Sequence, residues 1–109
     1  MNLDQVRAIA LSLPEVTEAP HHQKTSFRVK GKIFATAPPD GTYVNIFVDE
    51  HAVRAIVAAN PACRELWWGK SLAGVQVRLA DADEELVAEL LHDAWRVKAP
   101  TKKAPKKFV

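Results

Sequence analysis

Hydrophobic positions near the start of the chain repeat at the three-and-four spacing of a helix. That face is formed by Leu3, Val6, Ile9, Ala10 and Leu13. Asn2 and Gln5 have the spacing of a capping box, in which each side chain bonds the backbone of the other residue. Pro14 disfavours helical geometry at the residue before it. The pattern therefore predicts a helix that begins after Asn2 and ends at about Leu13.

The spacing changes to that of strands in SFRVKGKIFATA, residues 26–37. Two short β-rich runs flank Lys30 and Gly31, which predicts a hairpin because glycine accepts a positive φ at little cost. The pattern leaves the turn length open. A two-residue turn groups on one face Phe27, Val29, Lys32 and Phe34, and a three-residue turn groups there Phe27, Val29, Ile33 and Ala35. Before this hairpin, residues 15–25 are expected to be irregular or an edge strand.

The middle of the chain has the pattern of a strand followed by a helix. PPDGT is a turn sequence, and residues 43–48 (YVNIFV) have the β-branched and aromatic content of a central strand. Asp49 is in position to cap a helix whose apolar residues repeat at helical spacing. Asn60 and Pro61 are expected to end this helix.

A second hairpin and a last helix are predicted in the remaining part of the domain. Residues 65–68 form a short strand, and residues 74–80 alternate between apolar and polar positions as a second one. Asp81 or Asp83 caps the last helix, and its acids gather at the start, where the helix dipole favours them. We expect this helix to end near Lys98.

The predicted order is α-β(3)-α-β(2)-α within residues 1–99. Such an order indicates an α+β fold of two layers, with an antiparallel sheet and the helices on one of its faces. A chain of 109 residues has room for one such domain. The lone Cys63 rules out an internal disulfide, so we expect a cytoplasmic protein. The longest nearly apolar run, AIALSL, is far shorter than the ~20 residues of a membrane span, and no membrane partner is expected.

Positive charge is concentrated at the C-terminal end. Five of the 15 basic residues lie from Lys98 onward, where no acid occurs, leaving 10 basic against 13 acidic residues before them. Residues 100–109 have too little apolar surface to fold, so we expect a disordered tail rich in lysine, proline and alanine. Its candidate phosphate contacts are Lys102, Lys103, Lys106 and Lys107. A purely solubilising extension is the other interpretation.

The first hairpin is also basic. Lys24, Arg28, Lys30 and Lys32 occur within residues 24–32, which contain no acid. A two-stranded ribbon is one of the shapes that the DNA major groove admits, so this hairpin is a candidate DNA-binding wing. The alternative is an exposed hairpin whose charges keep it soluble. The second hairpin offers a sparser set of cations, Arg64, Lys70 and Arg78, offset by Glu65, and of these Lys70 and Arg78 are candidate contacts.

Trp67 and Trp68 are the candidate residues for stacking or for binding a partner. Adjacent residues of a strand point to opposite faces, so one core pocket cannot easily hold both indoles. An exposed indole can stack on a base or contact a protein partner, including a second copy of the chain. The alternative is one indole in the core and the other half-covered by a loop.

Candidate catalytic and metal-binding groups are few. The histidines, His21, His22, His51 and His92, do not have the spacing of metal ligands. Cys63 has no local base to activate it and is expected to be a small apolar filler. We therefore expect no metal, no cofactor and no enzymatic activity.

Three segments together resemble the MmcQ/YjbR family of small bacterial proteins. These are ALSLPEVTEAPHHQKTSFRVKGKIFATA, LWWGKSLAGVQVRL and LLHDAWRVKAP, and the resemblance spans roughly residues 3–99. It implies a two-layer α+β fold similar to the frataxin (CyaY) or secretion-chaperone type, with a proposed double-wing DNA-binding arrangement. Our leading hypothesis is a non-enzymatic DNA-binding protein that uses the basic hairpin and the lysine tail. The alternative is an interaction module, similar to a secretion chaperone, that binds a protein or small ligand through Trp67 or Trp68.

Overall fold

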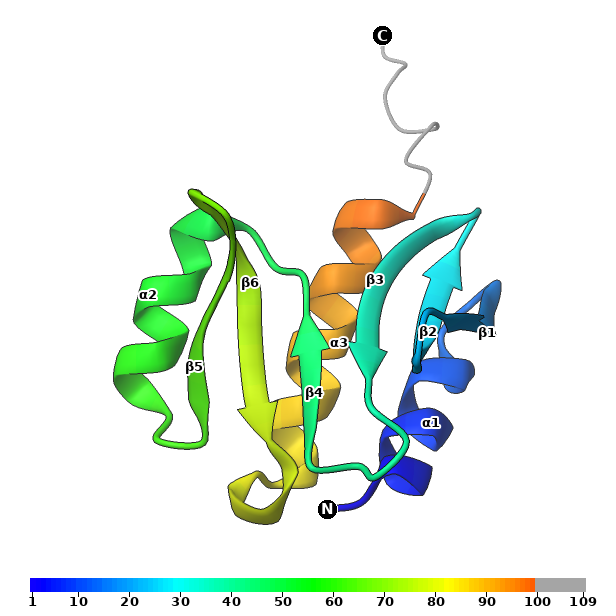
Figure 1. Ribbon diagram of the computed structural model, residues 1–109, viewed down its shortest axis with the longest axis horizontal. Helices are drawn as coiled ribbons and strands as arrows, with labels where there is room; N and C mark the ends of the chain where they lie inside the picture. Colours follow the sequence, from blue (N-terminus) through cyan, green and yellow to red (C-terminus); the bar gives the residue numbers. More distant parts are fainter. Residues whose placement is uncertain (100–109) are drawn as a thin grey trace, which may run out of the picture.

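The computed structural model describes residues 1–99 and contains three α-helices, six strands and a short 3-10 helix, η1 (Figure 1). The elements are α1 (Leu3–Ser12), β1 (Val16–His21), β2 (Lys24–Val29), β3 (Lys32–Ala37), β4 (Tyr43–Ile46), α2 (Glu50–Ala59), β5 (Cys63–Trp68), β6 (Ser71–Arg78), η1 (Leu79–Asp81) and α3 (Glu84–Lys98). The predicted lysine-rich tail, residues 100–109, lies outside the described residues. Among residues 1–99, no helix is both long and apolar enough to cross a membrane.

The strands form one antiparallel sheet in the order β1-β2-β3-β4-β6-β5. Figure 1 shows α1 and α3 behind the strands, where they pack against each other, and α2 packs on β5 and β6. The predicted α+β class, with an antiparallel sheet and helices on one face, is confirmed. Because α2 connects β4 to β5, the last hairpin returns β6 to the side of β4 and leaves β5 at the edge.

The sheet has one strand more than the predicted order. β1 pairs along its whole length with β2, from Val16 opposite Val29 to His21 opposite Lys24. Of the two interpretations left open for this segment, the edge strand is correct. Apolar alternation is weak here because an edge strand is mostly exposed, and Pro20 is tolerated because an edge strand has one unpaired side. The order is therefore α-β(4)-α-β(2)-α.

The helix caps follow the predicted signals. Asn2 and Gln5 form the capping box of α1, and the Asp49 side chain accepts a hydrogen bond at the start of α2. Of the two candidates for α3, the structure selects Asp83, whose carboxylate accepts from the Leu86 amide at 2.8 Å. Asp81 instead forms an ion pair with Arg78.

The register of the first hairpin combines a two-residue turn with a bulge. Val29 lies opposite Lys32, and both turn residues, Lys30 and Gly31, have positive φ. The bulge then shifts the register, so that Arg28 pairs with Ile33 and Phe27 with Ala35. As a result Phe34 and Ala35 are both fully buried, a combination that neither predicted grouping contains.

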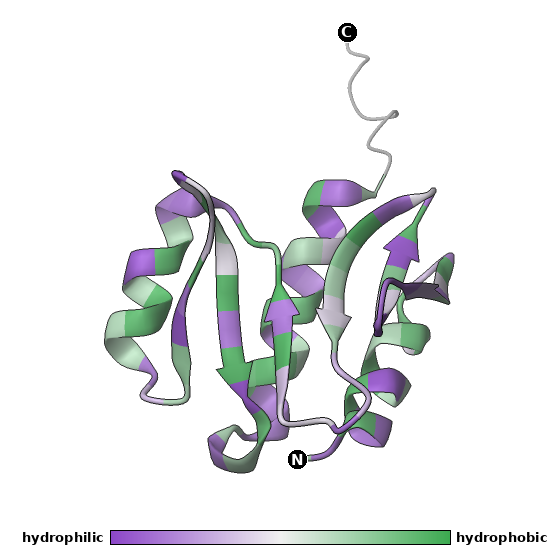
Figure 2. Ribbon diagram, in the orientation of Figure 1, coloured by the Kyte–Doolittle hydropathy of each residue, from purple (hydrophilic) through white to green (hydrophobic). Residues whose placement is uncertain are grey.

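Alternation along the central strands separates the core from the opposite face of the sheet. Val44 and Ile46 of β4, and Val75 and Val77 of β6, are fully buried in the core cluster that also contains the apolar residues of α3. Figure 2 shows the alternation along β6. Asn45 and Gln76 lie between these positions and therefore face away from the helices, and Thr36 of β3, which pairs with Asn45, lies on the same face. A polar strip thus crosses the middle of the helix-free face.

Candidate functional site

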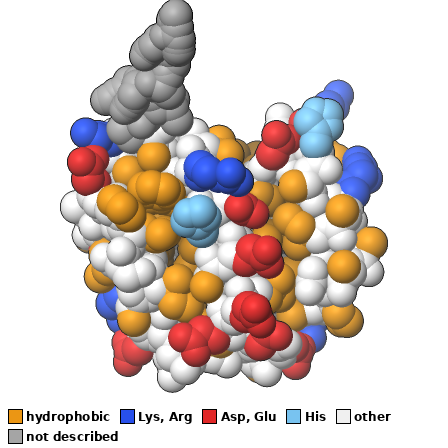
Figure 3. All heavy atoms as spheres, turned by 180° about the vertical axis from the view of Figure 1, so that it is seen from behind, with side chains coloured by type: hydrophobic (Ala, Val, Ile, Leu, Met, Phe, Trp, Pro, Cys, Tyr) orange, Lys and Arg blue, Asp and Glu red, His pale blue; other side chains and the backbone are white. Residues whose placement is uncertain are grey.

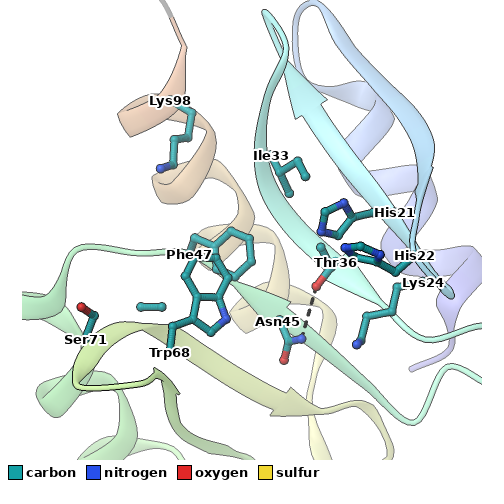
Figure 4. Close-up of a pocket in the computed structure, with 11 residues that line it drawn as sticks. His21, His22, Lys24, Ile33, Thr36, Asn45, Phe47, Trp68, Ser71 and Lys98 are labelled. Carbon is teal, nitrogen blue, oxygen red and sulfur yellow. Dashed lines mark hydrogen bonds between the residues drawn. The ribbon is translucent and has the colours of Figure 1, made fainter.

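A pocket of about 520 Å³ lies between the two hairpins (Figure 4). It opens there because β4 is short and pairs with β3 only at Ala35 and Thr36. The rest of β3 has no strand beside it on that side. The pocket therefore extends from the polar strip to Lys98 at the end of α3.

The floor of the pocket presents hydrogen-bond donors. Thr36 and Asn45 are 5% and 8% exposed, and the Asn45 amide nitrogen donates to the Thr36 hydroxyl at 3.2 Å. The Asn45 carbonyl accepts from the Gln76 amide at 3.1 Å. These bonds leave the Thr36 hydroxyl hydrogen and the second Asn45 amide hydrogen free to donate to a ligand. The floor thus suits a ligand with acceptor atoms.

One wall of the pocket is aromatic. The rings of Phe47 and Trp68 are 4.9 Å apart and tilted by 59°, and Trp68 remains 60% exposed. Gly74 permits this arrangement, because a Cβ there would lie 2.2 Å from the Ile46 carbonyl oxygen and 2.9 Å from the Phe47 Cα. The chain after β4 can therefore cross closely over β6 and bring Phe47 against Trp68.

The opposite wall is basic. His21 and His22 lie at the turn between β1 and β2 with ring centroids 4.6 Å apart, and Lys24 begins β2 beside them. Figure 4 shows these three residues across the pocket from Phe47 and Trp68, with Lys98 at the rim. Among residues 1–99, no Asp or Glu lines the pocket. The electrostatics of the pocket therefore favour an anion.

Carboxylates gather on the other side of the molecule. Figure 3 shows Asp and Glu side chains running down the helix side, and α3 alone contributes Glu84, Glu85, Glu89 and Asp93. The described part of the chain is thus polarised, with much of its acid away from the pocket.

The cations of the predicted wing have different surroundings. Arg28 donates to the Ser26 hydroxyl at 2.9 Å and to the Pro20 carbonyl at 3.2 Å, and Lys30 forms an ion pair with Glu15 at 3.1 Å. Lys24 lines the pocket, and Lys32 is exposed at the start of β3. Within residues 1–99, neither Lys24 nor Lys32 has a carboxylate within 4.0 Å. The wing is thus only partly free to contact phosphate.

The candidates of the second hairpin are separated by the length of β6. Lys70 is exposed in the turn between Trp68 and Ser71, both of which line the pocket. Arg78 lies at the other end of the strand, paired with Asp81 at 2.6 Å. Lys70 therefore lies in a turn next to two pocket residues, whereas Arg78 lies away from the pocket.

Neither tryptophan of the second hairpin fills the core. Trp67 is 45% exposed and its indole nitrogen donates to Glu65 at 3.0 Å, whereas Trp68 is more exposed and lines the pocket. The expectation that one core pocket would not hold both indoles is confirmed. Of the two, Trp68 is the one placed to contact a ligand in the pocket.

Several pocket residues were not singled out by the sequence pattern. Thr36, Asn45 and Phe47 resembled ordinary strand residues, and His21 and His22 were considered only as candidate catalytic or metal-binding groups. The histidine pair next to a basic strand was a usable signal. The sequence contained no signal that β3, β4 and β6 converge on one hollow, because this convergence depends on the bulge and on the short β4.

The remaining nucleophile and metal candidates lie elsewhere. Cys63 is buried at the start of β5, and burial raises the pKa of its thiol, which keeps it protonated at neutral pH. Within residues 1–99, no group of three or more His, Cys, Asp or Glu side chains is arranged to hold a metal ion.

Comparison with known protein families identifies the family of this chain. The YjbR family model matches residues 11–97, which include every strand of the sheet and nearly all of α3. The chain belongs to the YjbR family. The comparisons with curated proteins and with solved structures find no match. For this YjbR chain, the family match covers the pocket residues from His21 to Ala73 and ends one residue before Lys98.

Proposed function

We propose that this YjbR-family protein is a DNA-binding protein that contacts phosphates through cations grouped around the pocket. One observation carries the proposal. Lys24 and Lys98 line the pocket, Lys32 and Lys70 are exposed at the turns of the two hairpins, and none of the four forms an ion pair within residues 1–99. Cations without carboxylate partners are free to replace the counterions of DNA.

The predicted phosphate contacts differ in how free each cation is to bind DNA. Arg28 is held by Ser26 and the Pro20 carbonyl, so it is a weaker candidate than Lys24 or Lys32. Lys30 can still contribute, because an exposed ion pair such as the one with Glu15 is worth only about 0–1 kcal/mol. Lys102, Lys103, Lys106 and Lys107 follow Lys98 along the chain and remain proposed phosphate contacts. The proposed role is binding without catalysis, in the cytoplasm.

A salt titration tests this proposal. We expect labelled duplex DNA to bind in an anisotropy assay at about 50 mM salt and more weakly at about 200 mM. Replacing Lys24, Lys32, Lys70 and Lys98 together with Gln should reduce the slope of log affinity against log salt by about 3–4, since each phosphate contact contributes about 0.9.

Arg64→Gln is the matched control for that titration. Arg64 is exposed and, within residues 1–99, has no carboxylate within 4.0 Å, but it lines a different hollow with Thr42 and Arg78. Its loss should change the slope by much less than the roughly 0.9 that one phosphate contact contributes. Absence of binding at the lower salt would contradict the proposal. Binding that vanishes only when residues 100–109 are deleted would exclude the folded domain as the DNA contact.

A second candidate function is a module that binds a protein or a small ligand. Two exposed indoles, Trp67 and Trp68, favour it, because solvent-exposed aromatic residues are typical anchors of interfaces. A homodimer through this surface belongs to the same candidate. Sedimentation at increasing concentration tests the dimer, and tryptophan fluorescence that responds to a ligand but not to DNA would favour this function over the first.

A further inference from the structure

We infer that the pocket holds one unpaired nucleotide, with its base against Trp68 and its phosphate at the basic wall. This inference rests on the proposed function and extends it, because it adds a preference for single-stranded DNA or strand ends over intact duplex. It depends on the two unlike walls of the pocket and on the donors between them.

The aromatic wall provides a surface for a base. Phe47 contacts the Trp68 ring, with the two centroids 4.9 Å apart, and helps to fix its orientation, while 60% of Trp68 stays exposed. Stacking on an aromatic side chain is how many proteins hold single-stranded nucleic acid without sequence preference. In a duplex both faces of an inner base are covered by its neighbours, so a base that stacks on Trp68 must be unpaired or terminal.

The basic wall provides the partner for the phosphate. His21, His22 and Lys24 lie across the pocket from Trp68, as Figure 4 shows, and no carboxylate lines the space between. Lys98 at the rim offers a second cation for the neighbouring phosphate of a strand. Phe47 and Trp68 are thus separated across the pocket from His21, His22 and Lys24, as the ring and the phosphate are in a nucleotide.

The floor and the size of the pocket fit the same ligand. Thr36 and Asn45 offer donors to the ring nitrogens and carbonyl oxygens of a base edge, and both side chains are more than nine-tenths buried. The volume of about 520 Å³ lies within the range of about 300–1,000 Å³ typical of small-molecule sites. One nucleotide is a ligand of that class, whereas a base pair inside a duplex cannot enter.

The experiment compares five probes with the full-length protein: a single-stranded oligonucleotide, its duplex, a nucleoside 5′-monophosphate, the corresponding nucleoside, and inorganic phosphate. We expect the single strand to bind about tenfold tighter than the duplex at equal salt. The monophosphate should compete with the single strand better than either the nucleoside or phosphate does, because only the monophosphate engages both walls.

Trp68→Ala and Trp67→Ala form the matched pair of variants. Trp67 is the sequence neighbour of Trp68 but does not line the pocket. We expect Trp68→Ala to weaken the single strand about tenfold and to change duplex affinity less than twofold, whereas Trp67→Ala changes neither. Ala73→Leu, which adds bulk to the pocket lining while leaving both indoles in place, should also lower single-strand affinity. Circular dichroism of each variant checks that it is folded.

The possible outcomes separate this inference from the proposed function. Equal affinity for single strand and duplex, unaffected by Trp68→Ala and Ala73→Leu, would overturn the nucleotide pocket and leave DNA binding intact. Competition by the monophosphate at the pocket without binding of either DNA would overturn the DNA-binding function and support a pocket for a free ring-bearing anion. No binding of any probe would overturn both.

Discussion

The absence of a side chain at Gly74 allows the chain after β4 to pass closely over β6. A methyl group at this position would lie 2.2 Å from the Ile46 carbonyl oxygen and 2.9 Å from the Phe47 Cα. These are backbone atoms, so the contact cannot be relieved by turning a side chain. The wall formed by Phe47 and Trp68 therefore depends on a residue that takes no part in ligand contact.

We predict that Gly74→Ala lowers the free energy of unfolding by about 1–3 kcal/mol, as overpacking of a close contact does. Because Phe47 must move, the fluorescence of Trp68 should change as well. Urea denaturation followed by tryptophan fluorescence measures both effects.

Gly31→Ala is the comparison variant for this position. Gly31 has φ +80°, and within residues 1–99 no atom beyond its two chain neighbours lies within 4 Å of the place that a methyl group would occupy. Its substitution therefore costs about 1–2 kcal/mol through backbone conformation alone. It should leave the Trp68 emission unchanged. A Gly74→Ala protein with unaltered stability and emission would contradict the close approach.

Single residues also mark how far the sequence could predict the site. The positive charge of Lys24, Lys32 and Lys70 was legible, because charge is a property of the residue itself. The sequence could not show which cations lack a carboxylate partner. The pairing of Lys30 with Glu15 and of Arg78 with Asp81 depends on side-chain positions in the fold. The donors of Thr36 and Asn45 were hidden for the same reason.

At the scale of elements, Glu18 joins α1 to the first two strands. Arg7 on α1 donates to its carboxylate at 2.8 and 3.1 Å, and the Thr25 hydroxyl on β2 donates at 2.6 Å. The Arg7 hydrogen bond is the main cause that holds the pKa of Glu18 below its ordinary value, helped by Thr25 and opposed by burial. This cluster fixes the edge strand β1 against the helix.

We predict that this cluster makes stability depend on pH. Because the folded pKa of Glu18 lies below the unfolded value, its carboxylate stabilises the protein at neutral pH, and this contribution is lost as the pH falls below about 4. Glu18→Gln should cost about 1–2 kcal/mol at pH 7 and progressively less below pH 4. Urea denaturation of both proteins across this range measures the difference.

Glu15→Gln serves as the control for that pH series. Its ion pair with Lys30 is exposed on both sides, so its removal should cost no more than about 1 kcal/mol at any pH. A Glu18→Gln penalty as large at pH 3 as at pH 7 would contradict the role of the ionised carboxylate.

Elements were predicted to the extent that their signals are local. Helix caps and the turn at Lys30 and Gly31 depend on neighbouring residues, and the structure has them where the pattern put them. β1 lacks apolar alternation because it lies at an edge, so the pattern could offer it only as one of two interpretations. The bulge at Phe27 and Arg28 arises from pairing between strands, which no local spacing encodes.

At the scale of the whole molecule, acid and base are separated. The helix side carries the carboxylates of α3, whereas the described lining of the pocket between the hairpins contains Lys24 and Lys98 and no carboxylate. A negatively charged strand is therefore repelled from one side and attracted to the other. The net charge of +2 conceals this arrangement because it averages the two sides.

The most direct test of nucleic-acid binding at the pocket is an NMR titration of the isotopically labelled full-length protein with a single-stranded oligonucleotide. We predict that the first signals to shift are the backbone amides of Thr36 and Asn45 and the indole N–H of Trp68. The backbone amides of α3, from Glu84 up to but not including its last turn, should stay in place. Shifts confined to that helix side or to residues 100–109, with the pocket signals unmoved, would contradict binding at the pocket.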